Sequence, residues 1–398
     1  MHLLHLHSTF DPGGKELRAV RLMNAFGPAV RHTVVSAVPG ALGAAKAVDP
    51  SIEVDYPDNF EPLVGRPHPA RLLRLARAMK PFDLVLSYNW GAMDAVLAHS
   101  VFRDHLSLPA LVHHEDGFNQ DEATRLKTTR NWFRRVALAR SAALVVPSRR
   151  LEAIALDVWH QPRGRVQLIE NGIDTARYSK RPKPDALPRI IKREGEHWVG
   201  TLAGLRAVKN LPRLVRASAS LPEDWHLVII GEGPEREAIQ AEALRLGVAH
   251  RVHLPGFVSD PAKAVGLFDI FALSSDSEQF PISVVEAMAA GLPVASPEVG
   301  DVMGMVAEEN RSFIASPGDE VGLAQAISQL AGDQALRQTI GAANRARAAE
   351  LRRGAYDIRL PRALCKRSRK RRIGLTPFIA ASSALGERPI AHYTARQS

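Results

Sequence analysis

The sequence of 398 residues is poor in cysteine and has no long apolar run, and both absences narrow the class of protein. Cys365 is the one cysteine, which excludes an internal disulfide and favours a reducing compartment. No apolar stretch is as long as a membrane-spanning helix, which needs about 18 residues. The opening MHLLHLHSTF lacks a basic start and a small-residue cleavage site, so we interpret it as a strand rather than a signal peptide. A cytoplasmic protein is therefore expected.

Acidic residues are scarce near the C-terminus. Residues 352–398 contain twelve Lys or Arg and two Asp or Glu, so this segment accounts for the whole net charge of +10. Such a segment can bind phosphate groups of nucleic acid or anionic lipid. A solvated and poorly ordered basic tail over residues 353–398 is the alternative that we favour.

The chain is long enough for two domains, and its 45% hydrophobic and 24% charged residues are values of a globular protein. Short β-branched runs alternate with helical patterns, which indicates stacked βαβ units with parallel sheets. We predict two doubly wound, Rossmann-like α/β domains, with a ligand in the cleft between them at the carboxyl ends of the strands. The predicted boundaries are 1–178 for the N-terminal domain, 179–196 for a proline-rich linker and 197–352 for the C-terminal domain.

The same patterns predict the individual elements. Strands are expected near residues 2–7, 33–37, 83–88, 110–114 and 143–147, and again near 197–203, 225–230, 252–254, 270–273 and 293–296. Helices are expected near 15–26, 69–80, 90–99, 122–139, 211–220, 234–246, 281–290, 299–308 and 320–331.

The stretch SDSEQFPISVVEAMAAGLPVAS at 275–296 contains two acids eight positions apart, Glu278 and Glu286. Pro281 suits the first position of a helix, because the amide that it lacks would have no partner there. The amide of Ile282 then points out of the helix start, where the dipole favours an anion. A carboxylate can accept from two adjacent hydroxyls, so one acid suits a ribose and the other a hexose. The alternative is a buried helix with two incidental acids.

A second motif, GTLAGLRAVKN at 200–210, ends the first strand of the second half. Its cations, Arg206 and Lys209, lie at a loop-to-helix entry, where they can neutralise a diphosphate without a metal. The sequence has no Asp-x-Asp, in keeping with metal independence. The alternative is an exposed basic loop.

Four motifs in this order resemble the retaining glycosyltransferases of family 4, in the subset with Glu-Gln-x-Pro. They are GLRAVKN at 204–210, GEGPER at 231–236, LPGFV at 254–258 and SEQFPISVVEAMAAGLPV at 277–294. Asn-Gly-Ile-Asp at 171–174 and Asp-Pro-Gly-Gly at 11–14 also fit. The resemblance covers roughly residues 1–350 and implies a GT-B fold, in which the second domain holds most of a nucleotide-sugar donor.

The resemblance also implies roles for single residues. Arg206 and Lys209 would grip the donor diphosphate and stabilise the leaving nucleotide. Glu286 would bind the ribose, and Glu278 would face the transferred sugar. The remaining donor contacts would come from Phe257 at the base, from the amides around Phe280 and Ile282, and from the glycine loop of Gly13 and Gly14, where the missing side chains permit close approach.

In LPALVHHEDGF, at 108–118, the family places a histidine near the reacting sugar. His113, His114 and Asp116 compete for this role, and strand alternation directs the two histidines to opposite faces. We favour His114, with Asp116 as the alternative, and interpret His113 as structural. Gln279 and Pro281 stand where the family commonly has glycines, which leaves the donor sugar open.

Two basic stretches are candidates for contact with an anionic membrane. Residues 125–150 contain eight basic and no acidic residues, with Trp132 among them, and Arg71, Arg74, Arg77 and Lys80 form a stripe at helical spacing. Solvated helices with apolar core faces are the alternative, which we favour slightly. A peripheral position on the inner membrane face would bring a lipid-linked acceptor within reach.

We therefore expect a metal-independent hexosyltransferase that uses a UDP- or GDP-linked sugar, a hydroxyl acceptor and no cofactor, in cell-surface polysaccharide or lipid-linked glycan synthesis. One alternative is a sugar-nucleotide epimerase on the same fold. Another is a nucleic-acid-binding protein that acts through the basic tail. A nicotinamide dehydrogenase is disfavoured, because no G-x-G-x-x-G follows a first strand.

Overall fold

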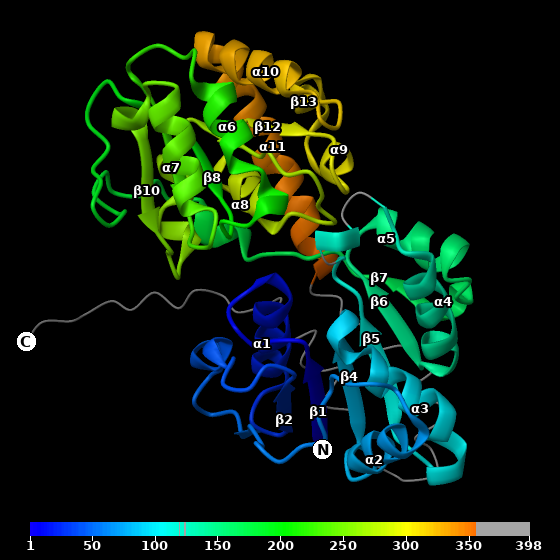
Figure 1. Ribbon diagram of the computed structural model, residues 1–398. Coiled ribbons are helices and arrows are strands. Elements are labelled where there is room, and N and C mark those ends of the chain that lie inside the picture. Colours follow the sequence, from blue (N-terminus) through cyan, green and yellow to red (C-terminus); the bar gives the residue numbers. More distant parts are fainter. Residues whose placement is uncertain (119, 123–124, 356–398) are drawn as a thin grey trace, which may run out of the picture. The chain divides into compact units, whose positions relative to one another are not determined.

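A computed structural model describes residues 1–118, 120–122 and 125–355 of the chain (Figure 1). Almost all of the predicted basic tail, from residue 356 onward, lies outside the described residues. Within the described part, no helix combines the length and the apolar character needed to cross a membrane. The described residues divide into two compact units: the first comprises residues 1–114 and 136–144, and the second comprises residues 115–135 and 145–355.

The first sheet has seven strands in the order β3-β2-β1-β4-β5-β6-β7. Its central strands are almost wholly buried, as expected for parallel strands with both faces covered. The order reverses between β1 and β4, which is the topological switch point of a doubly wound sheet. The strands are β1 (His2–His7), β2 (Arg31–Ser36), β3 (Val54–Asp55), β4 (Leu84–Tyr88), β5 (Ala110–His114), β6 (Ala143–Val146) and β7 (Val166–Leu168).

At the start of two of the helices that connect these strands, a side chain accepts a hydrogen bond from an amide of the first turn. The His68 ring accepts from the Arg71 amide at the start of α2, and Ser148 accepts from Leu151 at the start of α5. The helices are α1 (Gly14–Phe26), α2 (Pro69–Met79), α3 (Met93–Leu106), α4 (Thr128–Ala137) and α5 (Arg149–Ala153). The helix predicted near 122–139 is therefore shorter at its start, where Gln120–Glu122 forms a separate 3-10 turn.

The second sheet has six strands in the order β10-β9-β8-β11-β12-β13, and all of its neighbouring strands pair in parallel. The order reverses between β8 and β11. The strands are β8 (His197–Leu202), β9 (Trp225–Ile230), β10 (Val252–Gly256), β11 (Ile270–Ala272), β12 (Val294–Pro297) and β13 (Ile314–Ala315). The predicted pair of doubly wound, Rossmann-like parallel sheets is thus confirmed.

Two helices of this half differ from the prediction. Near 299–308, α9 is only four residues long and is followed by a 3-10 segment at Glu308–Phe313, in which buried Asn310 bonds both the amide and the carbonyl of Val294. Helix α11 follows α10 and was not among the predicted helices. The helices are α6 (Leu211–Ser218), α7 (Arg236–Arg245), α8 (Ile282–Ala290), α9 (Val302–Met305), α10 (Glu320–Gly332) and α11 (Gln334–Ala355).

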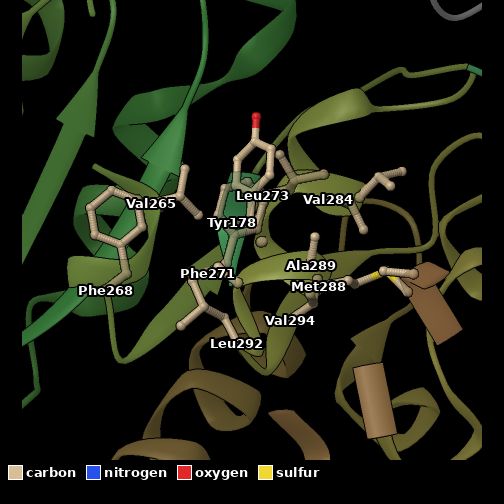
Figure 2. Packing of buried hydrophobic residues seen from close by; sticks show 14 of the residues in the cluster. Tyr178, Val265, Phe268, Phe271, Leu273, Val284, Met288, Ala289, Leu292 and Val294 are labelled. Atoms are coloured by element: carbon tan, nitrogen blue, oxygen red, sulfur yellow. The ribbon is translucent and has the colours of Figure 1, made fainter. Parts of the chain in front are cut away.

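One core of the second sheet lies between β11 and α8 (Figure 2). Phe271 from β11 and Val284 and Met288 from α8 are fully buried in it. Ile173, Tyr178 and Leu187 precede β8 in the chain and yet belong to this core. The segment that precedes β8 is therefore part of the core of the second sheet.

Candidate functional site

The loops that follow β8 and β11 meet at the carboxyl edge of the second sheet. Lys209, after β8, places its Nζ atom 2.5 Å from Oε1 of Glu278, after β11. The Ser275 hydroxyl donates to the same oxygen at 2.7 Å. The two predicted motifs, which are 69 residues apart at these positions, therefore come together as one ion pair.

The backbone of both loops is fixed by short-range bonds. Asn210 adopts the left-handed conformation (φ 44°, ψ 48°), which asparagine tolerates better than most residues, and its side-chain amide donates to Asp276 at 3.2 Å. Ser274 donates to the Lys209 carbonyl at 2.9 Å. These bonds hold Lys209 in place, whereas Arg206, at the start of the same turn, is exposed to solvent.

The glycine-rich motifs pack against this loop pair through their backbone. Gly231 has a φ of +149°, and a Cβ atom on it would lie 1.8 Å from the Ala203 carbonyl oxygen. Its amide donates to the Gly256 carbonyl at 3.0 Å. The motifs GLRAVKN, GEGPER and LPGFV are therefore neighbours at one edge, together with SEQF through Glu278. Phe257 in this group is 60% exposed.

Pro281 is the residue before the first turn of α8, with φ −68° and ψ 104°, and not the first helical residue that the sequence suggested. The difference arises because its ψ is extended, so helical geometry begins at Ile282. Phe280 is buried in the core, which leaves its backbone as the group that can face a ligand. The preceding loop is held by Asp301, whose amide donates to the Gln279 carbonyl at 2.9 Å.

Glu286 lies on the second turn of α8 and is 8% exposed. It is the one charged residue of that helix. The Tyr178 hydroxyl donates to Glu286 Oε1 at 2.8 Å. A buried carboxylate needs such partners, because burial of a charge without them is costly. Tyr178 was not a predicted site residue.

At the first sheet, Gly13 and Gly14 lie where α1 begins. Gly13 is in extended conformation before the helix (φ −157°), and Gly14 is its first residue. A Cβ atom on Gly13 would lie 2.6 Å from the Glu16 carboxylate, so a side chain there would displace the end of the Glu16 side chain. Lys15 follows and donates to the Ser8 hydroxyl at 3.0 Å.

Both histidines at the end of β5 are buried, on opposite faces of the strand. His113 places Nδ1 2.9 Å from the Ser87 hydroxyl, which fits a structural role. His114 stacks on Tyr88, with the ring centroids 4.8 Å apart. Burial, and then the charge of Arg18, hold the pKa of His114 well below its usual range, so the ring is neutral at pH 7. Asp116 is half-buried two residues further on.

His7, at the end of β1, joins this aromatic group and was not a predicted site residue. Its ring stacks on Tyr88 with centroids 4.0 Å apart and meets Phe10 edge-on at 4.9 Å. It is fully buried, and neither ring nitrogen bonds to any group in the described ranges. The sequence pattern that could have identified His7 is its spacing of two from His5, which directs both rings to one face of the strand.

The predicted basic stripe on α2 is wrong in part. Arg71 is buried, pairs with Asp94 at 2.6 Å and donates to the Pro62 carbonyl, and Arg74 pairs with Glu61 at 2.9 Å. The stripe forms partly on the buried face of α2, because the helix turns Arg71 toward α3. Arg71 and Arg74 are therefore paired with acids, whereas Arg77 and Lys80 are exposed to solvent.

Helix α4 also has a buried arginine, but its opposite face exposes apolar side chains to solvent. Arg134 is fully buried and pairs with Glu115 and Glu122, which are also buried. On the opposite face, Trp132 is 62% exposed and Val136 is 48% exposed. The Arg135 guanidinium lies 5.6 Å from the Trp132 ring centroid.

Comparison with known families covers most of the chain. Residues 12–177 match the model of the family described as Glycosyltransferase Family 4, and residues 183–347 match the family described as Glycosyl transferases group 1. Both halves of the chain match glycosyltransferase families. The matches support the family resemblance seen in the motifs, and they support a transferase.

Individual relatives are glycosyltransferases too. The N-acetyl-alpha-D-glucosaminyl L-malate synthase of Bacillus anthracis is 27% identical over 183 residues, which cover 46% of this chain and 48% of that protein. The lipopolysaccharide core biosynthesis glycosyltransferase LpsE of Rhizobium meliloti is 27% identical over 175 residues, or 44% and 46% of the two chains. The chain spans about half the length of these curated relatives.

Among solved structures, HepE of Anabaena in complex with UDP and glucose superposes with a TM-score of 0.73 at 21% identity. The alignment covers 90% of this chain and 98% of HepE. At this identity the likeness concerns the fold, and it agrees with the predicted GT-B class.

Proposed function

We propose that the protein is a retaining glycosyltransferase that moves a hexose from a nucleotide diphosphate sugar to a hydroxyl acceptor. The observation that carries the proposal is the contact between Lys209 and Glu278 at the carboxyl edge of the second sheet. This pair puts a cation for a diphosphate beside a carboxylate for sugar hydroxyls, at the position where doubly wound sheets bind ligands.

In this proposal, donor binding separates Lys209 from Glu278, and each of them then contacts a group of the donor. The diphosphate takes over Lys209, with Arg206 as the second cation, and sugar hydroxyls donate to the Glu278 carboxylate, which can only accept. The amides at the start of α8 add partial positive charge. Charge that develops on the leaving diphosphate is then stabilised by fixed protein groups rather than by a metal.

We assign to the remaining predicted residues the roles that the family resemblance implies. Glu286 binds the ribose, and the backbone near Phe257 meets the base. At the first sheet, Gly13 and Gly14 allow phosphate or sugar to approach the start of α1. The neutral His114 ring forms a hydrogen bond with the transferred sugar. Asp116 is the alternative candidate for this role.

We propose the donor and the acceptor by analogy with similar proteins. HepE was solved with UDP and glucose, which supports UDP-glucose as the first donor to test. LpsE acts in lipopolysaccharide core biosynthesis, which supports a cell-surface glycan as the acceptor class. We propose a cytoplasmic enzyme whose acceptor lies at the inner membrane face.

Lys209→Ala tests the function directly. The variant is expected to lower kcat by about 100-fold, because it removes one preorganised group that stabilises the leaving charge. Product is measured by chromatography with UDP-, GDP- and ADP-sugars, each with and without glycan acceptors. Near-normal turnover of Lys209→Ala would contradict the assignment, and product formed without any acceptor would indicate an epimerase.

Lys263→Ala is the matched control, because that side chain is 76% exposed and lies outside the site. It is expected to keep wild-type turnover. Addition of EDTA is expected to leave the wild-type rate unchanged. A strict requirement for a divalent metal would refute metal independence while leaving the donor site intact.

Contact with an anionic membrane is proposed through the exposed face of α4. Trp132 and Val136 can enter the headgroup region while Arg135 meets lipid phosphates. Trp132→Ala with Arg135→Gln is expected to lower sedimentation with phosphatidylglycerol vesicles by about tenfold. Binding that is equal for wild type and variant, or equal for neutral and anionic vesicles, would contradict this surface.

A further inference from the structure

Tyr178 combines an apolar setting for its ring with a polar contact for its hydroxyl. It is the last residue of the 3-10 turn Thr175–Tyr178, which follows the Asn-Gly-Ile-Asp motif. The ring belongs to the core between β11 and α8 and is 8% exposed. In Figure 2, the hydroxyl points away from the apolar side chains around the ring.

The hydroxyl reaches Glu286, 108 residues later in the sequence, and donates to Oε1 at 2.8 Å. The direction of the bond follows from chemistry, because an ionised carboxylate accepts and does not donate. Both groups are buried, so water competes little with the bond, and a bond to a charged group is among the stronger ones in proteins.

This bond restricts the carboxylate as well as satisfying it. A glutamate side chain rotates about its last bond over a broad range unless a partner fixes it. With Oε1 held by Tyr178, rotation of the carboxylate about its last bond is restricted. Recognition of two adjacent hydroxyls depends on such an orientation, since small misplacements of a binding group lower affinity.

We propose that Tyr178 is a positioning residue for Glu286 and that it sets the preference of the site for a ribose over a deoxyribose. The inference rests on the proposed function, in which Glu286 binds the ribose of the donor. It adds a residue from the segment before β8 to candidates of the second sheet that otherwise follow β8, β10 and β11 in the chain.

A purely structural role for Tyr178 makes a different prediction. Phenylalanine fills the same space in the core and lacks only the oxygen that bonds Glu286. If the ring alone mattered, Tyr178→Phe would leave ligand recognition unchanged. This substitution therefore separates the positioning role from the packing role.

The experiment measures Kd by calorimetry for UDP, GDP and ADP and for the 2′,3′-dideoxy form of each nucleotide that binds. Tyr178→Phe is expected to weaken binding of the ribonucleotide about tenfold, the scale of one bond to a charged group, and to change the dideoxy form by less than about twofold. In the donor assay, KM should rise while kcat changes little, because a ribose contact is equal in the ground and transition states.

Glu286→Gln gives a double-mutant cycle. Adding Tyr178→Phe to Glu286→Gln is expected to have little further effect, because the hydroxyl acts through the carboxylate. Tyr56→Phe is the matched control, since it removes a tyrosine hydroxyl from a half-buried side chain elsewhere in the chain. It should leave the preference for ribose unchanged.

The possible results separate a failure of this inference from a failure of the proposed function. If no nucleotide binds the wild type, the proposed function is overturned together with this inference. If nucleotides bind and Tyr178→Phe keeps the wild-type preference for ribose, only the positioning role is overturned. An equal loss of both sugar forms would also overturn it, because that result indicates a general effect on the fold.

Discussion

At the carboxyl edge of the second sheet the central side chains are charged and paired, whereas at the same edge of the first sheet they are aromatic and neutral. Lys209 and Glu278 form an ion pair after β8 and β11. His7, Tyr88 and His114 form a buried stack at the ends of β1, β4 and β5. Two doubly wound sheets, of seven and six strands, thus present different chemistry at their carboxyl edges.

The largest expected difference between the two edges is in their response to acid. Burial, followed by His5, Lys15 and His114, holds the pKa of His7 well below its usual range, and burial does the same for His5 and His114. The unfolded chain takes up these protons near pH 6.5, and the folded chain does not. The stability of the first unit is therefore complete above about pH 6.5 and falls below it, by about 1.4 kcal/mol per pH unit for each such histidine.

Hydrogen exchange between about pH 7.5 and pH 5, corrected for the intrinsic rate, is the measurement that resolves the two units. Protection in β1, β4 and β5 should fall faster than protection in β8, β9 and β11. His7→Phe should reduce this acid sensitivity by the share of one histidine, because its ring packs against Tyr88 and Phe10. Equal loss of protection in both units would remove the contrast between the edges.

A smaller effect, expected in the second unit, tests the backbone contact between its motifs. Gly231→Ala should cost about 3 kcal/mol of unfolding free energy, because the new methyl group would overlap the Ala203 carbonyl at a φ that other residues avoid. Gly247→Ala is the control, since Gly247 has a φ of +73° and nothing within 4 Å of an added Cβ atom. It should cost about 1 kcal/mol.

Chemical denaturation monitored by tryptophan fluorescence gives both values. Trp198 and Trp225 lie in the second unit and report on it. If Gly231→Ala and Gly247→Ala prove equally stable, the GEGPER loop does not lie against the loop after β8. The described arrangement of the loops at the charged edge would then be wrong.

Local sequence signals were sufficient for most of the fold. The apolar run at 225–230 coincides with β9, and the run at 2–7 coincides with β1. The two-residue strands β3 and β13 were missed, because two residues are too few for an alternating pattern. Helix α11 could have been found from its content of alanine, arginine and leucine, which favour helix.

The sequence singled out candidate residues but not the contacts between them. The motifs proposed Lys209, Glu278 and Glu286, yet nothing local showed that the first two form an ion pair. Tyr178 lies in a segment assigned to the edge of the first domain, and its bond to Glu286 depends on how the chain packs beneath the second sheet. Similarly, helical spacing alone gave Arg71 to a surface stripe, although tertiary contact with Asp94 buries it.

The Lys209–Glu278 pair has a consequence for which anions the loops can accept. An inorganic phosphate that drew Lys209 to itself would leave the Glu278 carboxylate, whose side chain is only 11% exposed, without its cation. In the proposed function, a donor that carries hydroxyl groups next to its phosphates would supply new partners to both Lys209 and Glu278. The resting ion pair would then favour sugar phosphates over phosphate alone.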